Sequence, residues 1–188
     1  MREPPRSANR RVEQSRAKVL AETYRQMLRT GIGGVSIDEV AREAGVSKAT
    51  IYRHWPSRSA LLIDACSRLG VPQEVPNTGS FVEDGRILLV HLADQLQSAS
   101  WSSVYPSIID FAERDPDIRA MQQGLHHAFM SPFETVIERA KERGELRADR
   151  PTRDLVAALV GPLFYRRWFS KENIDGRFIE SLMQTVAG

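Results

Sequence analysis

Apolar residues recur every three or four positions along most of the chain, which is the periodicity of an amphipathic α-helix. In the first third, this pattern predicts four helices that are separated at Gly31, Gly45 and Pro56. Residues 70–79 contain two prolines, two glycines and one asparagine, so they are predicted to link two lobes. No later segment alternates apolar and polar residues as a half-buried strand does.

Five further helices are predicted after this linker, over the approximate spans 81–99, 103–114, 116–143, 152–170 and 175–187. Pro132 lies within the third span and is expected to kink or split it. The sequence therefore predicts an all-α protein of about nine helices. Its lobes are expected at 15–69 and 70–188, after a disordered basic arm at 1–14 that holds four arginines and two prolines.

The second and third predicted helices are short and are joined by a tight turn. Ser36 and Glu39 form a capping box at the start of the second helix, and Gly45 ends it. Ser47 can cap the third helix, which begins directly after the turn. Two short helices joined in this way form a helix-turn-helix, whose second helix can lie in the major groove of DNA. The residues left to face the groove are Lys48, Ala49, Thr50 and Arg53.

Charge is distributed unevenly along the chain. Residues 1–69 hold 13 lysines and arginines against 7 acidic residues, whereas residues 70–188 hold 13 against 17. A compact basic segment is typical of a module that binds a polyanion, although basic arms also serve solubility alone. The charge therefore agrees with DNA binding by the first lobe. For Arg10 and Arg11, entry into a minor groove and a solvated tail stay equally open.

Membrane, redox and metal chemistry are not indicated. No apolar run approaches the roughly 18 residues that cross a bilayer, and the first residues lack the apolar core of a signal peptide. Cys66 is the only cysteine, which excludes an intrachain disulfide and a cysteine-rich zinc site. We therefore expect a cytoplasmic protein with no membrane contact, no cofactor and no metal.

The segment 35–62 resembles the DNA-binding domain of the tetracycline repressor (TetR) family. The resemblance rests on the run Ala44-Gly45-Val46-Ser47 and on isoleucine, tyrosine, histidine and an aromatic residue at positions 51, 52, 54 and 55. Two residues depart from the usual pattern: Trp55 stands where phenylalanine is common, and Arg58 stands where lysine is common. Both keep the chemistry, since tryptophan fills an aromatic core position and arginine offers cationic donors to a phosphate.

The resemblance implies a ligand-responsive regulator of transcription, in most cases a repressor, that binds a pseudo-palindromic operator in double-stranded DNA as a homodimer. It places Tyr52 and His54 on backbone phosphates, and Lys48, Thr50 and Arg53 on base edges or nearby phosphates. Arg58 is expected to meet a phosphate beside a helix N-terminus, and Arg53 is the best candidate for a guanine contact. The predicted DNA-binding set is Ser36, Ser47, Lys48, Ala49, Thr50, Tyr52, Arg53, His54 and Arg58. Simpler roles stay open for three of these residues: Tyr52 mainly packs, Thr50 is a solvated surface residue, and His54 only caps a carbonyl.

In the second lobe the resemblance is looser, and it implies a pocket for a small-molecule effector and a dimer interface. The candidate pocket residues are Trp101, Tyr105, Phe111, Phe129, Met130 and Phe133. The candidate interface residues are Leu155, Leu159, Leu163, Phe178, Leu182 and Met183. Both sets are also compatible with an ordinary helical core, because apolar residues at helical spacing pack in most proteins.

Two other classes of function are compatible with a helical fold. A helical adaptor would bind another protein through the second lobe and would lack the steep salt dependence of DNA binding. An enzyme would need a catalytic set, for which His126, His127 and Glu134, or His91 and Asp94, are the nearest candidates. The first set offers too few ligands, and the second is a common helical i, i+3 pair, so no catalysis is expected.

Overall fold

The computed structural model describes residues 6–67 and 74–187, with the side chains of residues 12–67, 74–98 and 102–187. This part of the chain contains nine α-helices and no strand, which confirms the predicted all-α class. The helices are α1 (Arg6–Thr30), α2 (Ile37–Ala44), α3 (Lys48–His54), α4 (Arg58–Cys66), α5 (Phe81–Gln97), α6 (Ala99–Ala112), α7 (Pro116–Glu142), α8 (Thr152–Phe164) and α9 (Gly176–Ala187). A 3-10 turn, η1 (Ile32–Gly34), follows α1, and a π-helical turn, η2 (Tyr165–Ser170), follows α8.

The helices form two compact units. Of the residues that the structure describes, the N-terminal unit comprises 6–67 together with 102–124, and the C-terminal unit comprises 74–101 together with 125–187. Most of α6 and the first turns of α7 cluster with the N-terminal helices in this division. Ser107 and Asp115 account for this, since each is hydrogen-bonded to that part of the chain, at Ile32 N (3.0 Å) and at Ser59 Oγ (2.7 Å).

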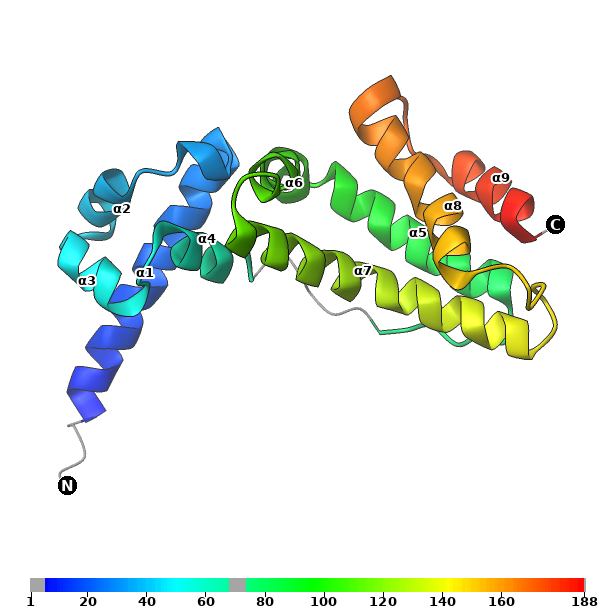
Figure 1. The fold of residues 1–188 in the computed structure, drawn as a ribbon, viewed down its shortest axis with the longest axis horizontal. Coiled ribbons are helices and arrows are strands. Elements are labelled where there is room, and N and C mark those ends of the chain that lie inside the picture. The colour runs from blue at the N-terminus through cyan, green and yellow to red at the C-terminus, as the bar shows by residue number, and fades with distance from the viewer. Residues whose placement is uncertain (1–5, 68–73, 188) are drawn as a thin grey trace. The chain divides into compact units, whose positions relative to one another are not determined.

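In the N-terminal unit, α1 packs against α2 and α4, and α2 packs against α3, as Figure 1 shows. The centre of this core is formed by side chains at most 1% exposed, namely Val19, Met27, Val40, Ile51 and Leu61. The apolar periodicity of the sequence had placed Met27, Val40, Ile51 and Leu61 on the inner faces of these helices. Burial of such side chains stabilises the unit by roughly 1.5–3 kcal/mol each relative to exposure.

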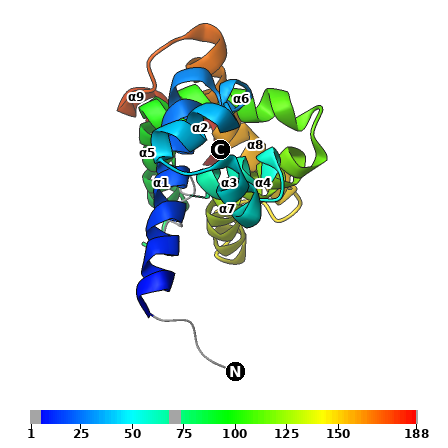
Figure 2. The ribbon, with the colours of Figure 1, turned by 90° about the vertical axis from the view of Figure 1, so that its left-hand side faces the viewer.

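The first helix is longer than the sequence analysis predicted. It begins at Arg6, so residues 6–14, which were expected to belong to a disordered arm, are helical. Arginine, alanine, glutamine and glutamate make up most of this stretch, and all four favour a helix even without an apolar face. Figure 2 shows these first turns of α1 extending beyond the other helices of the N-terminal unit.

In the C-terminal unit, α5 packs against α8 and α9, and α8 packs against α9. The Met183 side chain of α9 packs directly over Gly85 of α5, where a Cβ atom would lie 2.5 Å from Met183 Cε. The predicted split at Pro132 is absent, since α7 runs unbroken from Pro116 to Glu142. A proline removes one backbone donor from a helix, and here the rest of the helix continues around it. The predicted span 152–170 instead changes character at Tyr165, where α8 gives way to η2.

Candidate nucleic-acid interface

The predicted helix-turn-helix is formed by α2, the turn at residues 45–46 and α3. Gly45 ends α2 in the left-handed conformation, with φ 68° and ψ 35°. Gly45 N donates to Arg42 O at 3.2 Å, and Val46 N donates to Ala41 O at 3.0 Å. This pair of hydrogen bonds is a Schellman motif, which satisfies the last carbonyls of α2 and turns the chain sharply into α3.

Two serines hold the starts of the two helices. Ser36 Oγ accepts a hydrogen bond from Glu39 N at 3.4 Å, and Ser47 Oγ accepts one from Thr50 N at 3.1 Å. Ser36 is half-buried and Ser47 is exposed. Both were predicted to belong to the DNA-binding set, and the structure uses both hydroxyl groups as helix caps. Their contribution to the interface is therefore to position α2 and α3.

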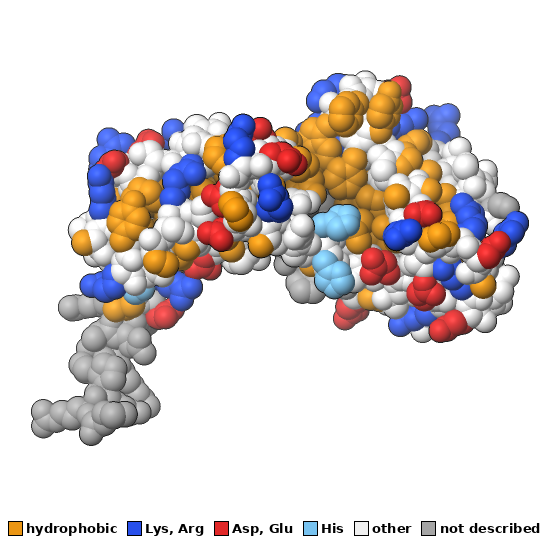
Figure 3. All heavy atoms as spheres, viewed as in Figure 1, with side chains coloured by type: hydrophobic (Ala, Val, Ile, Leu, Met, Phe, Trp, Pro, Cys, Tyr) orange, Lys and Arg blue, Asp and Glu red, His pale blue; other side chains and the backbone are white. Residues whose placement is uncertain are grey.

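The outward face of α3 carries most of the predicted DNA-binding residues. Lys48, Ala49, Tyr52 and Arg53 are exposed, whereas Ile51 on the opposite face is 1% exposed and anchors the helix in the core. The Tyr52 ring is 47% exposed, so about half of it is open to a partner. In the face drawn in Figure 3, lysine and arginine side chains are spread over the N-terminal unit. The structure thus brings these four residues together on one open helix surface.

Lys48 and Thr50 already have partners within the helix-turn-helix. The Lys48 ammonium forms an ion pair with Asp38 of α2, and both side chains are more than half exposed. Thr50 Oγ1 lies 3.0 Å from Ser47 Oγ, and Thr50 is half-buried. An exposed ion pair is worth only about 0–1 kcal/mol, so a phosphate can compete for Lys48. The hydroxyl group and the backbone N–H of Thr50 both contact Ser47 Oγ, which fixes this residue at the start of α3.

His54 is placed differently from the exposed residues of α3. It is half-buried, and its Nε2 atom is buried without a hydrogen-bond partner in the described part of the chain. Its ring meets the Trp55 ring edge-on, with centroids 5.7 Å apart. The predicted phosphate contact cannot therefore involve Nε2 in this arrangement.

Arg58 was predicted to meet a phosphate, and the structure gives it another role. Its guanidinium donates from Nε to Val35 O at 3.2 Å and from Nη2 to Gly33 O at 3.0 Å and to Ile32 O. Three backbone carbonyls thus occupy a side chain that is itself half-buried. Arg58 fastens the start of α4 to η1, because only a forked, planar donor can span several acceptors at once.

The surroundings of Arg58 include two residues of the N-terminal unit that lie far along the chain, Phe111 and Asp115. The Phe111 ring lies 6.0 Å from the Arg58 guanidinium and directly against Gly33, where a Cβ atom would meet Phe111 Cε2 at 2.6 Å. Ser59 Oγ donates to Asp115 Oδ2 at 2.7 Å, and this hydrogen bond lowers the pKa of Asp115. Phe111, which the sequence suggested for an effector pocket, therefore packs against η1 and α4.

A buried polar contact that the sequence analysis missed fixes the C-terminal end of α3. Trp55 is 4% exposed, and its indole Nε1 donates to Asp64 Oδ2 at 2.8 Å. Arg16 of α1 forms an ion pair with the same oxygen at 2.8 Å, and its guanidinium lies 5.7 Å from the Trp55 ring centroid. Phenylalanine, which is common in this position, has no group that could donate this hydrogen bond. The departure from the usual residue was the available signal.

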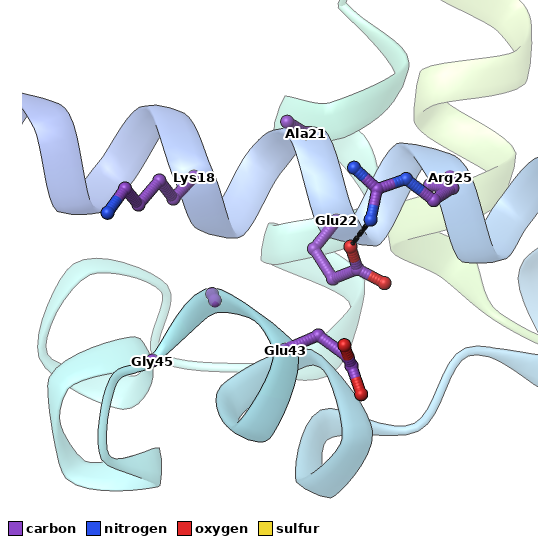
Figure 4. Close-up of a pocket in the computed structure, with 7 residues that line it drawn as sticks. Lys18, Ala21, Glu22, Arg25, Glu43 and Gly45 are labelled. Atoms are coloured by element: carbon purple, nitrogen blue, oxygen red, sulfur yellow. Dashed lines mark hydrogen bonds and ion pairs between the residues drawn. The ribbon is translucent and has the colours of Figure 1, made fainter.

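A groove of about 400 Å³ lies between α1 and the end of α2. Figure 4 shows its lining, in which Glu22 is paired with Arg25, Glu43 of α2 lies next to this pair, and Lys18 lies farther along α1. Ala21, Ala44 and Gly45 complete it. Two cations and two carboxylates balance one another, so the groove has no net preference for an ion of either sign.

The residues predicted to line an effector pocket are divided between the two units. Tyr105 and Phe111 belong to the N-terminal unit, whereas Phe129, Met130 and Phe133 belong to the C-terminal unit. Tyr105, Met130 and Phe133 are at most 7% exposed, and burial raises the pKa of the Tyr105 hydroxyl. The side chain of Trp101 lies outside the described residues. The resemblance had grouped residues that the structure assigns to different units.

The residues predicted to form a dimer interface lie largely in the core of the C-terminal unit. Leu155, Leu159, Leu163 and Met183 are at most 1% exposed, Leu182 is 9% exposed and Phe178 is half-buried. The side chains of the first four residues are therefore buried by packing within one chain. The opposite face of α8 and η2 is exposed, and it comprises Ala157, Ala158, Gly161, Tyr165 and Phe169.

No helix of the described ranges is long and apolar enough to cross a membrane. Across residues 6–67 and 74–187, no group of three or more histidine, cysteine, aspartate or glutamate residues is arranged to hold a metal ion. His91, His126 and His127 are all exposed on their helices.

Two family models match the chain. The model described as "Bacterial regulatory proteins, tetR family" matches residues 19–65, and the one described as "Tetracyclin repressor-like, C-terminal domain" matches residues 75–186. The chain belongs to the TetR family. It is therefore a helix-turn-helix regulator of transcription, as the segment 35–62 had indicated.

Relatives of this TetR-family chain match it along nearly its whole length. The "Uncharacterized HTH-type transcriptional regulator YdeS" of Bacillus subtilis (strain 168) is 26% identical over 181 residues, which are 94% of this chain and 89% of that protein. The "DNA-binding transcriptional repressor TetR" of Mycobacteroides abscessus is 29% identical over 179 residues, which are 94% and 93% of the two chains.

A solved structure agrees with the fold. The crystal structure of the TetR family transcription regulator SCO0332 is 26% identical to this chain and superposes with a TM-score of 0.66, covering 93% of this chain and 97% of that one. These three relatives are regulators of transcription rather than enzymes. The comparisons lend no support to the adaptor alternative.

Proposed function

We propose that this TetR-family chain binds a pseudo-palindromic operator as a symmetric dimer that places two α3 helices in successive major grooves. The observation that carries the proposal is the outward face of α3. Its exposed residues Lys48, Ala49, Tyr52 and Arg53 stand on a helix that is fixed by the Ser47 cap, the Gly45 turn and buried Ile51. A rigid helix with an open polar face is what major-groove recognition requires.

The roles of the exposed residues differ in what they contribute to affinity. Lys48 and Tyr52 are proposed to contact backbone phosphates, which fix the register on DNA without reading sequence. Arg53 is proposed to read a guanine, because an arginine fork matches guanine O6 and N7. Arg53→Ala should then cost about 1–3 kcal/mol on operator DNA and much less on random DNA.

A matched control keeps this test specific. Arg29→Ala removes another exposed arginine, in the last turn of α1 and outside the helix-turn-helix, and should leave operator affinity unchanged. Equal losses on operator and random DNA in the Arg53→Ala variant would identify a phosphate contact and contradict the base-reading role.

The experiment that tests DNA recognition is selection of bound fragments from random duplex DNA, followed by affinity measurements across a salt series. Enrichment of a palindrome, with affinity that falls steeply as salt rises, is the expected result, because each neutralised phosphate releases counterions. Absence of enrichment together with a flat salt dependence would contradict the proposal.

The exposed face of α8 and η2 is proposed as the surface that meets the second subunit. Ala157, Ala158 and Gly161 form a stripe of small residues that permits close approach of another helix. Tyr165 and Phe169 continue it as a stacked pair, with ring centroids 5.9 Å apart and exposures of 59% and 77%. Exposed aromatic rings next to such a stripe are typical of a surface that is covered in the assembled protein.

Sedimentation equilibrium tests this interface. Ala158→Glu should shift the protein toward the monomer, because a carboxylate would be buried against the partner. Ala148→Glu adds the same charge in the exposed segment after α7 and serves as the control. A dimer that both variants leave intact would exclude this face.

Regulation by a small molecule completes the proposal. The relative from Mycobacteroides abscessus is named a repressor, and we infer that operator occupancy by this chain blocks transcription in the bacterial cytoplasm. An effector that favours a conformation with wrongly spaced α3 helices would release the DNA, and by linkage the DNA would weaken effector binding by the same factor. Calorimetry with the effector once identified, with and without operator, tests this reciprocity; equal affinities would refute it.

A further inference from the structure

The backbone is irregular where α8 ends. Residues 165–170 form the π-helical turn η2, and Lys171 follows in the left-handed conformation with φ 59°. Lys171 is the one residue other than glycine with a positive φ in the described part of the chain. π-helical turns are rare and occur frequently at functional sites, and a left-handed lysine is strained. Both features occur within one stretch of seven residues, which points to a role beyond packing.

A notch of about 270 Å³ opens at this stretch, within the C-terminal unit. It is bordered by the end of α5, by η2 and by the segment that leads to α9, and its lining residues are Gln97, Arg166, Arg167, Lys171, Glu172, Asn173 and Ile174. Three of these are cations and one is a carboxylate. The notch therefore carries a net positive charge in a lobe that is acidic overall.

The first arginine is held firmly at the edge of the notch. Arg166 Nη1 donates to Asn173 O at 2.6 Å, and Arg166 Nε lies 3.3 Å from Glu172 Oε2. Its guanidinium also lies 3.5 Å from the centroid of the Phe178 ring. These contacts neutralise Glu172 locally and leave the charge of the other two cations uncompensated.

The second arginine and the lysine supply the donors. Arg167 Nε donates to Leu96 O at 2.9 Å, which caps the end of α5 and fixes the plane of the guanidinium. The terminal nitrogens of Arg167 and the Lys171 ammonium have no partner among the residues the structure describes. A guanidinium whose orientation is already fixed loses little freedom when it binds an anion, so its remaining donors are ready for one.

We propose that this notch binds a small oxyanion, either a free phosphate or carboxylate or the phosphate or carboxylate group of a larger ligand, through Arg167 and Lys171. At about 270 Å³ the notch is smaller than the roughly 300–1,000 Å³ of pockets for whole drug-sized ligands, and it has room for an oxyanion group. Charge-assisted hydrogen bonds from an arginine fork and an ammonium suit a tetrahedral or planar oxyanion. The notch belongs to the C-terminal unit, whereas α3 belongs to the N-terminal unit.

Calorimetric titration of the full-length chain with inorganic phosphate tests this site, with acetate as a second titrant at the same ionic strength. Saturable binding of one anion per chain is expected. Lys171→Asn should weaken it about tenfold or more, since it removes one charged donor while asparagine tolerates the left-handed conformation. Tighter binding of phosphate indicates a phosphate-bearing ligand, and tighter binding of acetate indicates a carboxylate.

Arg153→Gln provides the matched control, because it removes one positive charge from the 87%-exposed Arg153 of α8, outside the notch. This variant should bind the anion as the natural protein does, and circular dichroism should show that both variants stay folded. Equal weakening by the two substitutions would show a diffuse charge effect and overturn the proposal. Absence of saturable binding for both titrants would overturn it as well.

Discussion

Replacing Arg58 with lysine separates a structural role from a phosphate contact. A lysine keeps the positive charge that a phosphate would need, but its ammonium is a single compact donor. It cannot reach Val35 O, Gly33 O and Ile32 O together as the Arg58 guanidinium does. If Arg58 acts by holding the backbone carbonyls, Arg58→Lys destabilises the protein. The positive charge at position 58, and with it any attraction to DNA, is unchanged by this substitution.

The magnitude follows from these hydrogen bonds. Each bond from a charged donor contributes about 1.5–3 kcal/mol when it is buried, and solvent lowers this value for a half-buried side chain. Loss of one or two of the three bonds should therefore cost about 2 kcal/mol. For a chain of 188 residues, 1 kcal/mol corresponds to about 2–4 °C in the melting temperature. The melting temperature should fall by about 4–8 °C.

Thermal denaturation and DNA titration across a salt series decide between the two roles. The structural role predicts a lower melting temperature for Arg58→Lys and an unchanged salt dependence of DNA binding. A phosphate contact predicts a different pattern. The melting temperature of Arg58→Lys would then equal that of the natural protein, and Arg58→Ala would reduce the slope of DNA affinity against salt concentration by about 0.9 per subunit. That second pattern would refute the role derived from the structure.

Three further outcomes concern Trp55, Gly33 and Cys66 of the N-terminal unit. Trp55→Phe should lower the free energy of unfolding by about 1–2 kcal/mol in urea, and its effect should shrink in an Asp64→Ala background, which has no side-chain acceptor for the indole; additive losses would show that the two residues do not interact. Gly33→Ala should cost about 1–3 kcal/mol, because its Cβ would lie 2.6 Å from a ring carbon of α6, whereas Gly124→Ala, with open space around it in α7, should be neutral or stabilising. Burial raises the pKa of the Cys66 thiol to about 12, so the neutral thiol stabilises the fold at pH values below the thiol's unfolded pKa, and this contribution is lost as the pH rises toward 12. A colorimetric thiol reagent at pH 8 should therefore label the urea-unfolded protein rapidly and the folded protein slowly; rapid labelling of the folded protein would contradict the burial.

The helix-turn-helix could be predicted because its determinants are local. Ser36, Gly45 and Ser47 act on residues no more than five positions away, through a cap, a left-handed turn and a second cap. Such hydrogen bonds depend on residue type and spacing, which the sequence contains in full. For the same reason the limits of α5, α7 and α9 lie within two residues of those predicted, whereas α6 begins earlier and α8 ends earlier than predicted.

The roles of Arg58 and Trp55 could not be predicted in the same way. Each side chain had the right chemistry for the expected role, but its partners lie elsewhere in the chain: backbone carbonyls of η1 for Arg58, and Asp64 for Trp55. The departures from the usual family residues marked both positions without showing what they contact. Side-chain donors bind whatever acceptor the fold places within reach, and that placement is not a local property.

The sequence by itself determined the helices, their caps, the turn and the exposed face of α3, because all of these depend on residues within one or two turns of one another. Only the tertiary structure decided which apolar helix faces are buried in the core of the chain. It buried Leu155, Leu159 and Leu163 within the chain and left Tyr165 and Phe169 exposed. Periodicity shows that a helix has an apolar face, but whether that face meets the same chain or a partner depends on which helices pack against it.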